Sequence, residues 1–454
     1  MFLSTLSQPE GRAQLRRVMQ LSVPAVLTQI TTIAMQYIDS AMVGNLGANA
    51  SAAIGLVSTT TWLLGGIGGA VASGFGVQLA QYIGANDAKN ARQVVRHGFA
   101  AGFLAALFLM IVSVCISGSL PRWLGGEQVL WKEASAYFLV FALTIPFMEL
   151  NRLAATFLQS AGNMVVPSIL NAVMCLLDVV LNAIFIPRYG VLGAAIGTGL
   201  SVVVICLVQL CYCCFQYDPL RLRGDERFTP DRGIYRRALK IGLPIGAESA
   251  AMSGAYVAST VIIAPLGTIA IAAHSFAITA ESLCYMPGYG IGSAAATLVG
   301  QSIGAKDYPL ARRYGHITTA FGGIMMGLTG LLMFFACPLV FRLLTPVAQV
   351  QTVGVQILRI GLLAEPLYGI SIVASGALRG AEDTFVPSLM NLFSMWVVRL
   401  GLAVVLVPRL GIHGMWIAMA TELCFRGLVL LHRQLHSKYL KKDLLAENKT
   451  PTQL

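Results

Sequence analysis

The amino-acid sequence predicts an all-α membrane protein with twelve transmembrane helices in two six-helix parallel repeats. Three observations support this fold class: an apolar composition, twelve long apolar runs, and a series of matching residues about 220 positions apart. Together they place most of the chain inside a lipid bilayer.

The composition is that of a chain whose outer surface meets lipid. Of the 454 residues, 56% are hydrophobic and only 11% are charged, whereas soluble proteins carry about 25% charged residues because their surface faces water. The net charge of +11 does not indicate nucleic acid, since the basic residues lie in short gaps between apolar runs. Such gaps are typical of positively charged cytoplasmic loops. We therefore expect contact with the lipid bilayer and no binding of nucleic acid.

Twelve runs are long enough to cross a bilayer, which takes about 20 mostly apolar residues. They cover residues 18–44, 52–82, 95–117, 133–158, 165–186, 191–215, 239–264, 269–299, 314–338, 351–377, 385–407 and 412–432. The longest polar stretch divides them into two sets of six. The predicted parts are an N-lobe (1–216), a cytoplasmic linker (217–238), a C-lobe (239–433) and a polar cytoplasmic tail (434–454).

The Lys and Arg residues in the gaps predict the orientation. If the N-terminus lies inside, 22 of them fall on the cytoplasmic side and 5 on the other. An excess of Lys and Arg in short cytoplasmic loops sets the orientation of membrane proteins. We expect both termini in the cytoplasm, because an even number of helices returns the chain to the side on which it started.

The two halves of the chain repeat each other. With a shift of 220 residues, Pro24 meets Pro244, residues 81–87 meet 301–307, and Asn171 meets Asn391; one residue is then inserted before Pro187 meets Pro408. Six helices per repeat make the repeats parallel, related by an axis along the membrane normal, with substrate sites near the midplane. This architecture favours a transporter over an enzyme, a receptor or a structural protein.

Several motifs in this order resemble the multidrug and toxic compound extrusion (MATE) family. They are Pro24 leading to Tyr37-Ile38-Asp39, the segments 81–87 and 301–307, and the loop 378–384. The resemblance covers about residues 20–430 and is greater to the proton-coupled, DinF-like bacterial branch than to the NorM-like branch. It implies a secondary active antiporter of the bacterial inner membrane that exports small organic compounds, cationic or amphipathic, in exchange for protons.

The same resemblance assigns roles to individual residues. Asp39 matches the acid on the first helix of that branch, and Asp178 matches the acid on its fifth helix, so these two are expected to couple transport to the cation. Met174 stands where such proteins often have Asn, and Tyr368 stands where NorM-like members have an acid. A NorM-type sodium site is therefore doubtful, although a sodium-coupled exporter and a lipid-linked saccharide flippase remain alternatives.

Polar side chains inside the predicted helices support these assignments. A carboxylate at the bilayer centre costs about 2.5–3.5 kcal/mol, so it normally faces a cavity or a partner. Asp39 falls on a polar stripe of the first helix, and Asp178 on a narrow polar seam of the fifth. The alternatives are a helix-end position for Asp39 and plain helix–helix hydrogen bonding for Asp178. The residues expected to line the substrate cavity are Gln36, Tyr37, Asn151, Asn171, Asn182 and Thr198.

The second half contains a further polar network. Arg399 lies in the middle of a predicted helix without a local partner, so we expect a carboxylate from another C-lobe helix to pair with it. The candidates are Glu248, Glu281 and Glu365, with Tyr368 nearby. Glu149 with Arg152 and Glu422 with Arg426 are spaced to form ion pairs within one helix. Whether the network couples transport or only stabilises the lobe is left open by the sequence.

The remaining patterns exclude other function classes. The sequence has no phosphate-binding loop of the form Gly-x4-Gly-Lys-Ser/Thr, so energy comes from an ion gradient or another subunit. The predicted N-lobe helices contain only Arg152 as an interior base, which disfavours the flippase, and residues 84–92 lack the major-facilitator loop pattern. We expect a monomer that is not an enzyme and has no cofactor or metal, with the proton as coupling ion and sodium as the other candidate.

Overall fold

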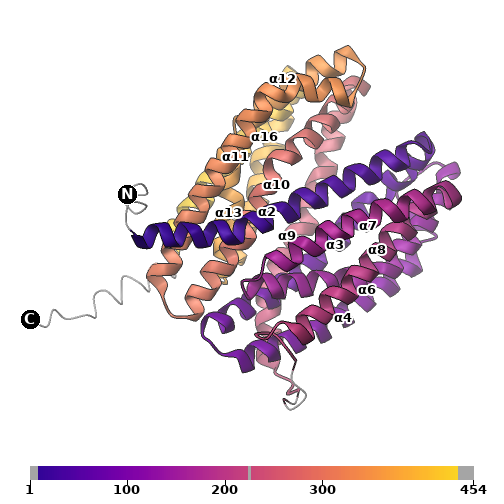
Figure 1. The fold of residues 1–454 in the computed structure, drawn as a ribbon. Coiled ribbons are helices and arrows are strands. Elements are labelled where there is room, and N and C mark those ends of the chain that lie inside the picture. The colour runs from indigo at the N-terminus through magenta and orange to yellow at the C-terminus, as the bar shows by residue number, and fades with distance from the viewer. Residues whose placement is uncertain (1–8, 223–225, 227, 438–454) are drawn as a thin grey trace, which may run out of the picture. The chain divides into compact units, whose positions relative to one another are not determined.

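The computed structural model describes residues 9–222, 226 and 228–437, which form helices and connecting turns without a strand (Figure 1). Eleven of the described helical segments are long and apolar enough to cross a membrane, and the helix pair 348–362 and 365–380, bent by 54°, makes a twelfth. The predicted twelve-helix fold is therefore confirmed. Part of the expected linker (223–225 and 227) and most of the expected tail (438–454) lie outside the described residues.

The helices pack into two compact units, of which one comprises residues Ile30–Ser249 and is called unit 2. It contains the second part of α2 and the first part of α9. The helix α2 spans Pro9–Gly44, and α9 spans Arg232–Ile263. The complete elements between them are α3 (Ala48–Gly84), α4 (Ala88–Ile116), α5 (Leu120–Trp123), the 3-10 turn η1 (Gln128–Leu130), α6 (Trp131–Ser160), α7 (Val165–Tyr189), α8 (Val191–Cys211) and the π-helical η2 (Tyr212–Gln216).

The other unit comprises Met1–Gln29 and Ala250–Leu454 and is called unit 1. It contains the first part of α2 and the second part of α9. Its complete elements are the 3-10 turn η3 (Ala264–Leu266), α10 (Thr268–Gly304), α11 (Tyr308–Leu344), α12 (Ala348–Leu362), α13 (Glu365–Gly380), α14 (Phe385–Phe393), the π-helical η4 (Ser394–Arg399), α15 (Leu400–Leu410) and α16 (Ile412–Leu435).

The division into units respects the sequence repeat. It falls after Gln29 in α2 and after Ser249 in α9, positions that are 220 residues apart. Each of these helices also contains a proline, Pro24 and Pro244, at repeat-equivalent positions. The units are defined by which residues pack together, whereas the N-lobe and C-lobe are defined by the sequence repeat. The lobe boundaries therefore stay a prediction.

Corresponding helices make corresponding contacts inside the two units. In unit 2, α6 packs against α3, α4 and α8, and α7 packs against α8; in unit 1, α13 packs against α10, α11 and α16, and α15 packs against α16. The π-helical η4 interrupts the eleventh span between Asn391 and Pro408. Because a π-turn accommodates one extra residue, η4 accounts for the insertion that changes the shift between repeats from 220 to 221.

One pair of equivalent helices differs. Pro146 lies inside the continuous helix α6, whereas its equivalent Pro366 follows the break between α12 and α13. Proline lacks the N–H that an uninterrupted helix would use and clashes with the preceding turn, so either a kink or a break is expected at both positions. In unit 1 the break places Glu365 in the first turn of α13.

Apolar packing forms a separate core in each unit. The core of unit 1 is built around Trp416 and Phe341, and that of unit 2 around Phe157 and Leu153, all at most 1% exposed. Glycines allow the closest contacts: a Cβ added at Gly376 of α13 would lie 2.3 Å from the carbonyl oxygen of Gly292 of α10. Gly292 and Gly376 therefore allow α10 and α13 to pack closely.

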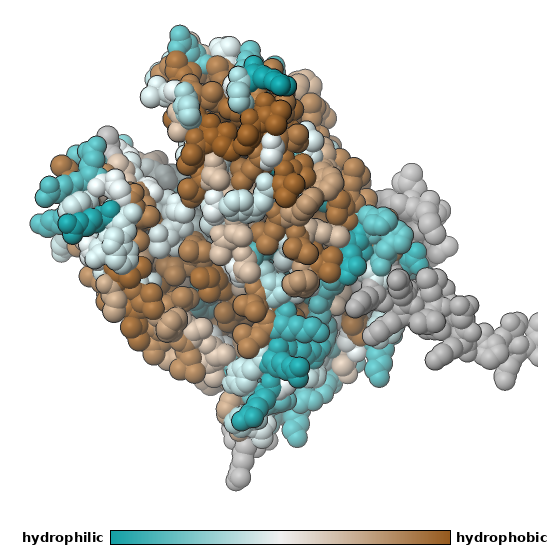
Figure 2. Space-filling model, turned by 180° about the vertical axis from the view of Figure 1, so that it is seen from behind, coloured by the Kyte–Doolittle hydropathy of each residue, from teal (hydrophilic) through white to brown (hydrophobic). Residues whose placement is uncertain are grey.

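The outer surface carries many large apolar side chains. Figure 2 shows hydrophobic residues over much of the visible face, with hydrophilic residues gathered in separate patches. Examples are Leu104 and Phe108 of α4 and Leu332 and Phe335 of α11, each at least 65% exposed. A patch of this extent is not stable against water, and it matches the apolar interior of a bilayer.

The polar segment before α9 is held against unit 2. Glu226 accepts hydrogen bonds from Arg92 of α4, with its Oε1 3.0 Å from Arg92 Nε. The Nε2 atom of the buried His97 accepts from the backbone N–H of Asp231 over 3.0 Å. Asp231 in turn accepts from the N–H of Gly233 in the first turn of α9, so this part of the segment is fixed to α4.

Candidate cation-coupling site

The strongest candidate site is a group of two acids and one amide inside unit 2. Asn182 of α7 donates from Nδ2 to Asp39 Oδ1 over 2.9 Å and to Asp178 Oδ2 over 3.2 Å. The two acids therefore bind the same amide group. Asp178 and Asn182 are fully buried, and Asp39 is partly exposed. The structure thus brings together the two acids that the sequence selected on separate helices.

The chemistry of this group suits the handling of a proton. Two neighbouring carboxylates repel each other, and a proton bound by one of them removes this repulsion. Among the described residues neither acid forms an ion pair, and the buried Oδ1 atoms of Asp178 and Asn182 have no hydrogen-bond partner. A buried acceptor without a donor is costly, so binding of a proton or another cation here is favoured.

Two further residues shape the group and were not selected from the sequence. Gly197 of α8 lies against Asn182, and a Cβ at this position would be 2.2 Å from Asn182 Oδ1. The half-buried Tyr137 of α6 interacts electrostatically with both acids. Tyrosine in an apolar helix gives no periodic signal, and the contact of Gly197 depends on the approach of α8 to α7, so neither was accessible from the sequence.

The other expected cavity residues of unit 2 are dispersed. Asn171 donates to Thr32 Oγ1 over 3.1 Å, so it joins α7 to α2 away from the acids. Gln36 is exposed, while Tyr37 and Thr198 are half-buried. Asn151 lies on α6, where its backbone oxygen accepts from Gln209 over 3.5 Å. The structure supports no single cluster of these residues, and their contact with substrate stays a prediction.

Unit 1 contains a different polar group, centred on Glu422 of α16. Arg399 donates to Glu422 Oε2 from Nη2 over 2.6 Å and from Nε over 3.0 Å, and Ser394 donates to Oε1 over 2.6 Å. Arg426 Nε lies 3.1 Å from Oε1. We expected the partner of Arg399 to be Glu248, Glu281 or Glu365, and this was wrong: Glu422 hydrogen-bonds to Arg399 and also forms an ion pair with its neighbour Arg426.

The three expected partners have other positions. Glu281 interacts electrostatically with Arg399 but has a buried Oε1 without a hydrogen-bond partner, and the fully buried Glu365 has no partner at either carboxyl oxygen among the described residues. Tyr368 packs its ring under Arg426, 5.3 Å from the guanidinium carbon. Glu248 is buried and belongs to unit 2. The expected pair Glu149–Arg152 is present at 3.8 Å.

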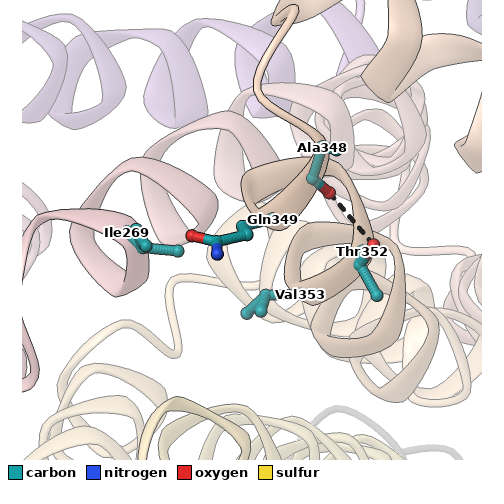
Figure 3. A pocket seen from close by; sticks show the side chains of 5 residues that line it. All are labelled: Ile269, Ala348, Gln349, Thr352 and Val353. Atoms are coloured by element: carbon teal, nitrogen blue, oxygen red, sulfur yellow. Dashed lines mark hydrogen bonds between the residues drawn. The ribbon is translucent and has the colours of Figure 1, made fainter.

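Other features of the described residues do not point to a site. They contain no group of three or more His, Cys, Asp or Glu side chains placed to hold a metal ion. A shallow hollow in unit 1 lies between α10 and α12 and is lined by Ile269, Ala348, Gln349, Thr352 and Val353 (Figure 3). Its lining holds no charged side chain, and Thr352 is used in a hydrogen bond to Ala348 O over 3.0 Å.

Comparison with known proteins agrees with the repeat and the fold. The MatE family model matches residues 24–184 and again residues 244–405. A probable multidrug resistance protein NorM of Deinococcus radiodurans is 30% identical over 96% of this chain and 98% of its own length. One from Chromobacterium violaceum is 27% identical over 95% of both chains.

Solved structures show the same fold. A MATE protein in the straight conformation superposes with a TM-score of 0.90 at 22% identity, covering 94% of this chain and 97% of its own. A transporter of the MOP superfamily from Pyrococcus furiosus, whose binding pocket is described as reversed in polarity, gives a TM-score of 0.88 at 20% identity, covering 93% and 95%. The curated relatives carry the NorM name, so the DinF-like branch stays a prediction. The double match of the family model across most of the chain shows that it belongs to the MATE family of multi-pass membrane transporters and is not an enzyme.

Proposed function

We propose that the protein is a secondary antiporter that exports small organic compounds, cationic or amphipathic, in exchange for protons. The observation that supports this most is the Asp39–Asn182–Asp178 group, in which two acids share one amide and have no basic partner among the described residues. The names of the relatives, multidrug resistance proteins, support export of several compounds. We place the protein in the bacterial inner membrane, the location that fits these relatives. We further propose that both termini are cytoplasmic and that the chain acts as a monomer.

In this proposal the proton and the helix α2 work together. Asn182 binds both acids when one is protonated, so loss of the proton would place two negative charges next to each other and weaken the attachment of α2 to α7. Arrival of a proton would remove charge, draw Asp39 toward α7 and allow α2 to rearrange, which displaces the substrate. Release of the proton on the cytoplasmic side would complete the cycle.

A sodium-coupled exporter is the second candidate. It is favoured by the buried carboxyl groups of Glu281 and Glu365 in unit 1, which interact electrostatically with each other and have oxygen atoms without a hydrogen-bond partner. Carboxylate oxygens are the ligands that hard cations prefer. The lipid-linked saccharide flippase has no comparable support in the structure.

The test is efflux from proteoliposomes with the two gradients imposed separately. Purified protein is reconstituted, loaded with a fluorescent organic cation, and given either a pH gradient at equal sodium or a sodium gradient at equal pH. The proposal expects efflux with the pH gradient and little with the sodium gradient. Efflux driven by sodium alone would establish the second candidate, and no efflux under either gradient would reject both.

A further inference from the structure

The repeat places opposite charges at equivalent positions of the two units. With the shift of 221 that follows the η4 insertion, Asp178 of unit 2 corresponds to Arg399 of unit 1. Arg399 lies at the end of the π-helical segment, and π-turns are frequent at functional sites. The fold is thus duplicated while the charge at this position is reversed, so the two units are suited to partners of opposite charge.

The group around Glu422 has more positive than negative charge in direct contact. Two guanidinium groups, Arg399 and Arg426, share a single carboxylate, and all three side chains are at least 91% buried. Removing a charge from water is costly unless an opposite charge compensates it. One of the two arginines is therefore only partly compensated by Glu422.

Arg426 is the arginine that has a hydrogen-bond donor without an acceptor. Its Nε–H does not form a hydrogen bond, although Glu422 is 3.1 Å away. Its guanidinium lies over the ring of Tyr368 and interacts electrostatically with Tyr256 and Tyr289. These two tyrosines are 52% and 44% exposed, so they lie between the buried arginine and the outside of the unit.

The surface that carries Tyr289 is suited to water rather than lipid. On α10, Ser275, Ser282 and Tyr289 follow one another at intervals of seven residues, and Ser293 lies one turn further, so all four point to one side of the helix. Each of them is exposed or partly exposed. Lipid-facing surfaces of membrane helices are apolar, and polar side chains face protein or a water-filled cavity. Tyr289 therefore borders a space that a dissolved compound can enter.

We propose that Arg426, with the hydroxyl groups of Tyr256 and Tyr289, binds a carboxylate group of the transported compound. A guanidinium and phenol hydroxyls are strong donors for such an anion, and hydrogen bonds to charged groups are stronger than neutral ones. The inference rests on the proposed export function and names a substrate class: organic cations that also carry a carboxylate, in addition to purely cationic ones.

Glu281 sets the conditions under which this site is available. It is within electrostatic range of Arg399, so when ionised it would compensate the positive excess and compete with the carboxylate of the compound. Replacement of Glu281 by glutamine removes this competitor with little change of shape. If the site binds a carboxylate, Glu281→Gln should bind the compound more tightly than the wild-type protein does. An ion cluster that only stabilises the fold would give no such increase in affinity.

The experiment compares two dyes that differ in one group. Rhodamine 110 carries a free carboxylate, and rhodamine 123 is its methyl ester, so only the first can occupy an anion site. Binding to purified protein in detergent is followed by fluorescence polarisation without any ion gradient, which separates this test from that of proton coupling. The variants are Tyr256→Phe combined with Tyr289→Phe, and Glu281→Gln.

We expect the double tyrosine variant to bind rhodamine 110 at least ten-fold more weakly, because two hydroxyl groups that donate to the charged carboxylate are lost. Its binding of rhodamine 123 should equal that of the wild-type protein. Glu281→Gln is expected to bind rhodamine 110 several-fold more tightly, with no change for the ester. Equal changes for both dyes, no change for either dye, or no measurable binding of rhodamine 110 to the wild-type protein would overturn the proposal. Loss of gradient-driven efflux with this dye preference intact would overturn the coupling proposal only.

Discussion

Removal of charges from the Glu422 group should destabilise the protein by amounts that follow its geometry. Glu422 is fully buried and receives two hydrogen bonds from Arg399, one from Ser394 and a close contact from Arg426. Removing one partner of a buried ion pair costs about 3–5 kcal/mol, because the other charge is left uncompensated. The group has three charges, so the cost depends on which charge is removed.

Arg399→Leu leaves Glu422 with Arg426 and Ser394, so its effect should be at the lower end, about 3 kcal/mol. Glu422→Gln leaves two buried guanidinium groups beside each other without an anion, so its effect should be at the upper end, about 5 kcal/mol. The double variant Arg399→Leu with Glu422→Gln leaves one charge rather than two, and should be less destabilised than the sum of the single variants.

Thermal unfolding in detergent measures the order of these effects. Arg409→Leu on the same span is the matched control, since Arg409 is exposed at the end of α15 and its loss should change stability by less than about 0.5 kcal/mol. The expected order of melting temperature is wild type and control, then Arg399→Leu, then Glu422→Gln. A melting temperature of Arg399→Leu equal to that of wild type, or strict additivity in the double variant, would refute the pairing and its energetics.

Three further predictions concern coupling and topology. Asp39→Asn keeps the shape of the side chain but cannot exchange a proton, so the variant should fold and lose efflux driven by a pH gradient. Ser259→Ala, at the equivalent position of unit 1, should leave this efflux nearly unchanged. Normal efflux by Asp39→Asn would remove this residue from the mechanism. Gly197→Ala should displace Asn182, because the new Cβ would lie 2.2 Å from its Oδ1, and should lower pH-driven efflux several-fold. The control Gly401→Ala, where a Cβ meets nothing within 4 Å, should leave efflux unchanged. Equal efflux by the two variants would contradict a role for the position of Asn182. A cysteine at the exposed Thr229, in a cysteine-free background, should react with an impermeant thiol reagent only from the cytoplasmic side, and labelling from outside in intact cells would invert the orientation.

The fold could be predicted because lipid imposes one strong rule on the sequence. Each span must be long and apolar, so the twelve runs correspond closely to the helices of the structure, and the repeat follows from residues at fixed spacing. The details of the breaks could not be predicted. Pro146 and Pro366 are equivalent in sequence, yet α6 continues and α12 ends, because the result depends on the packing around each proline.

Inside the site, polar residues on one helix face were the informative signal. Asp39, Asp178 and Asn182 were selected from such faces, and the structure places their polar atoms within hydrogen-bonding distance. The partner of Arg399 was missed because Glu422 had been assigned to Arg426, four residues away on the same helix. That assignment treated a carboxylate as having one partner, whereas Glu422 forms ion pairs with two arginines.

The two units show how a duplicated fold comes to hold different chemistry. Equivalent helices keep equivalent contacts, so a side chain at a given repeat position occupies an equivalent place in its own unit. Asp39 has Ser259 as its equivalent, and Asp178 has Arg399, with one inserted residue taken up by η4. Substitutions at a few repeat-equivalent positions and a single π-turn thus give one unit an acidic group and the other a basic one. If the first handles the proton and the second a carboxylate, coupling does not require the proton and the compound to compete for the same atoms. The helices α2 and α9 contribute residues to both units, so substitutions of the repeat-equivalent Pro24 and Pro244 inside them test the coupling without touching either site.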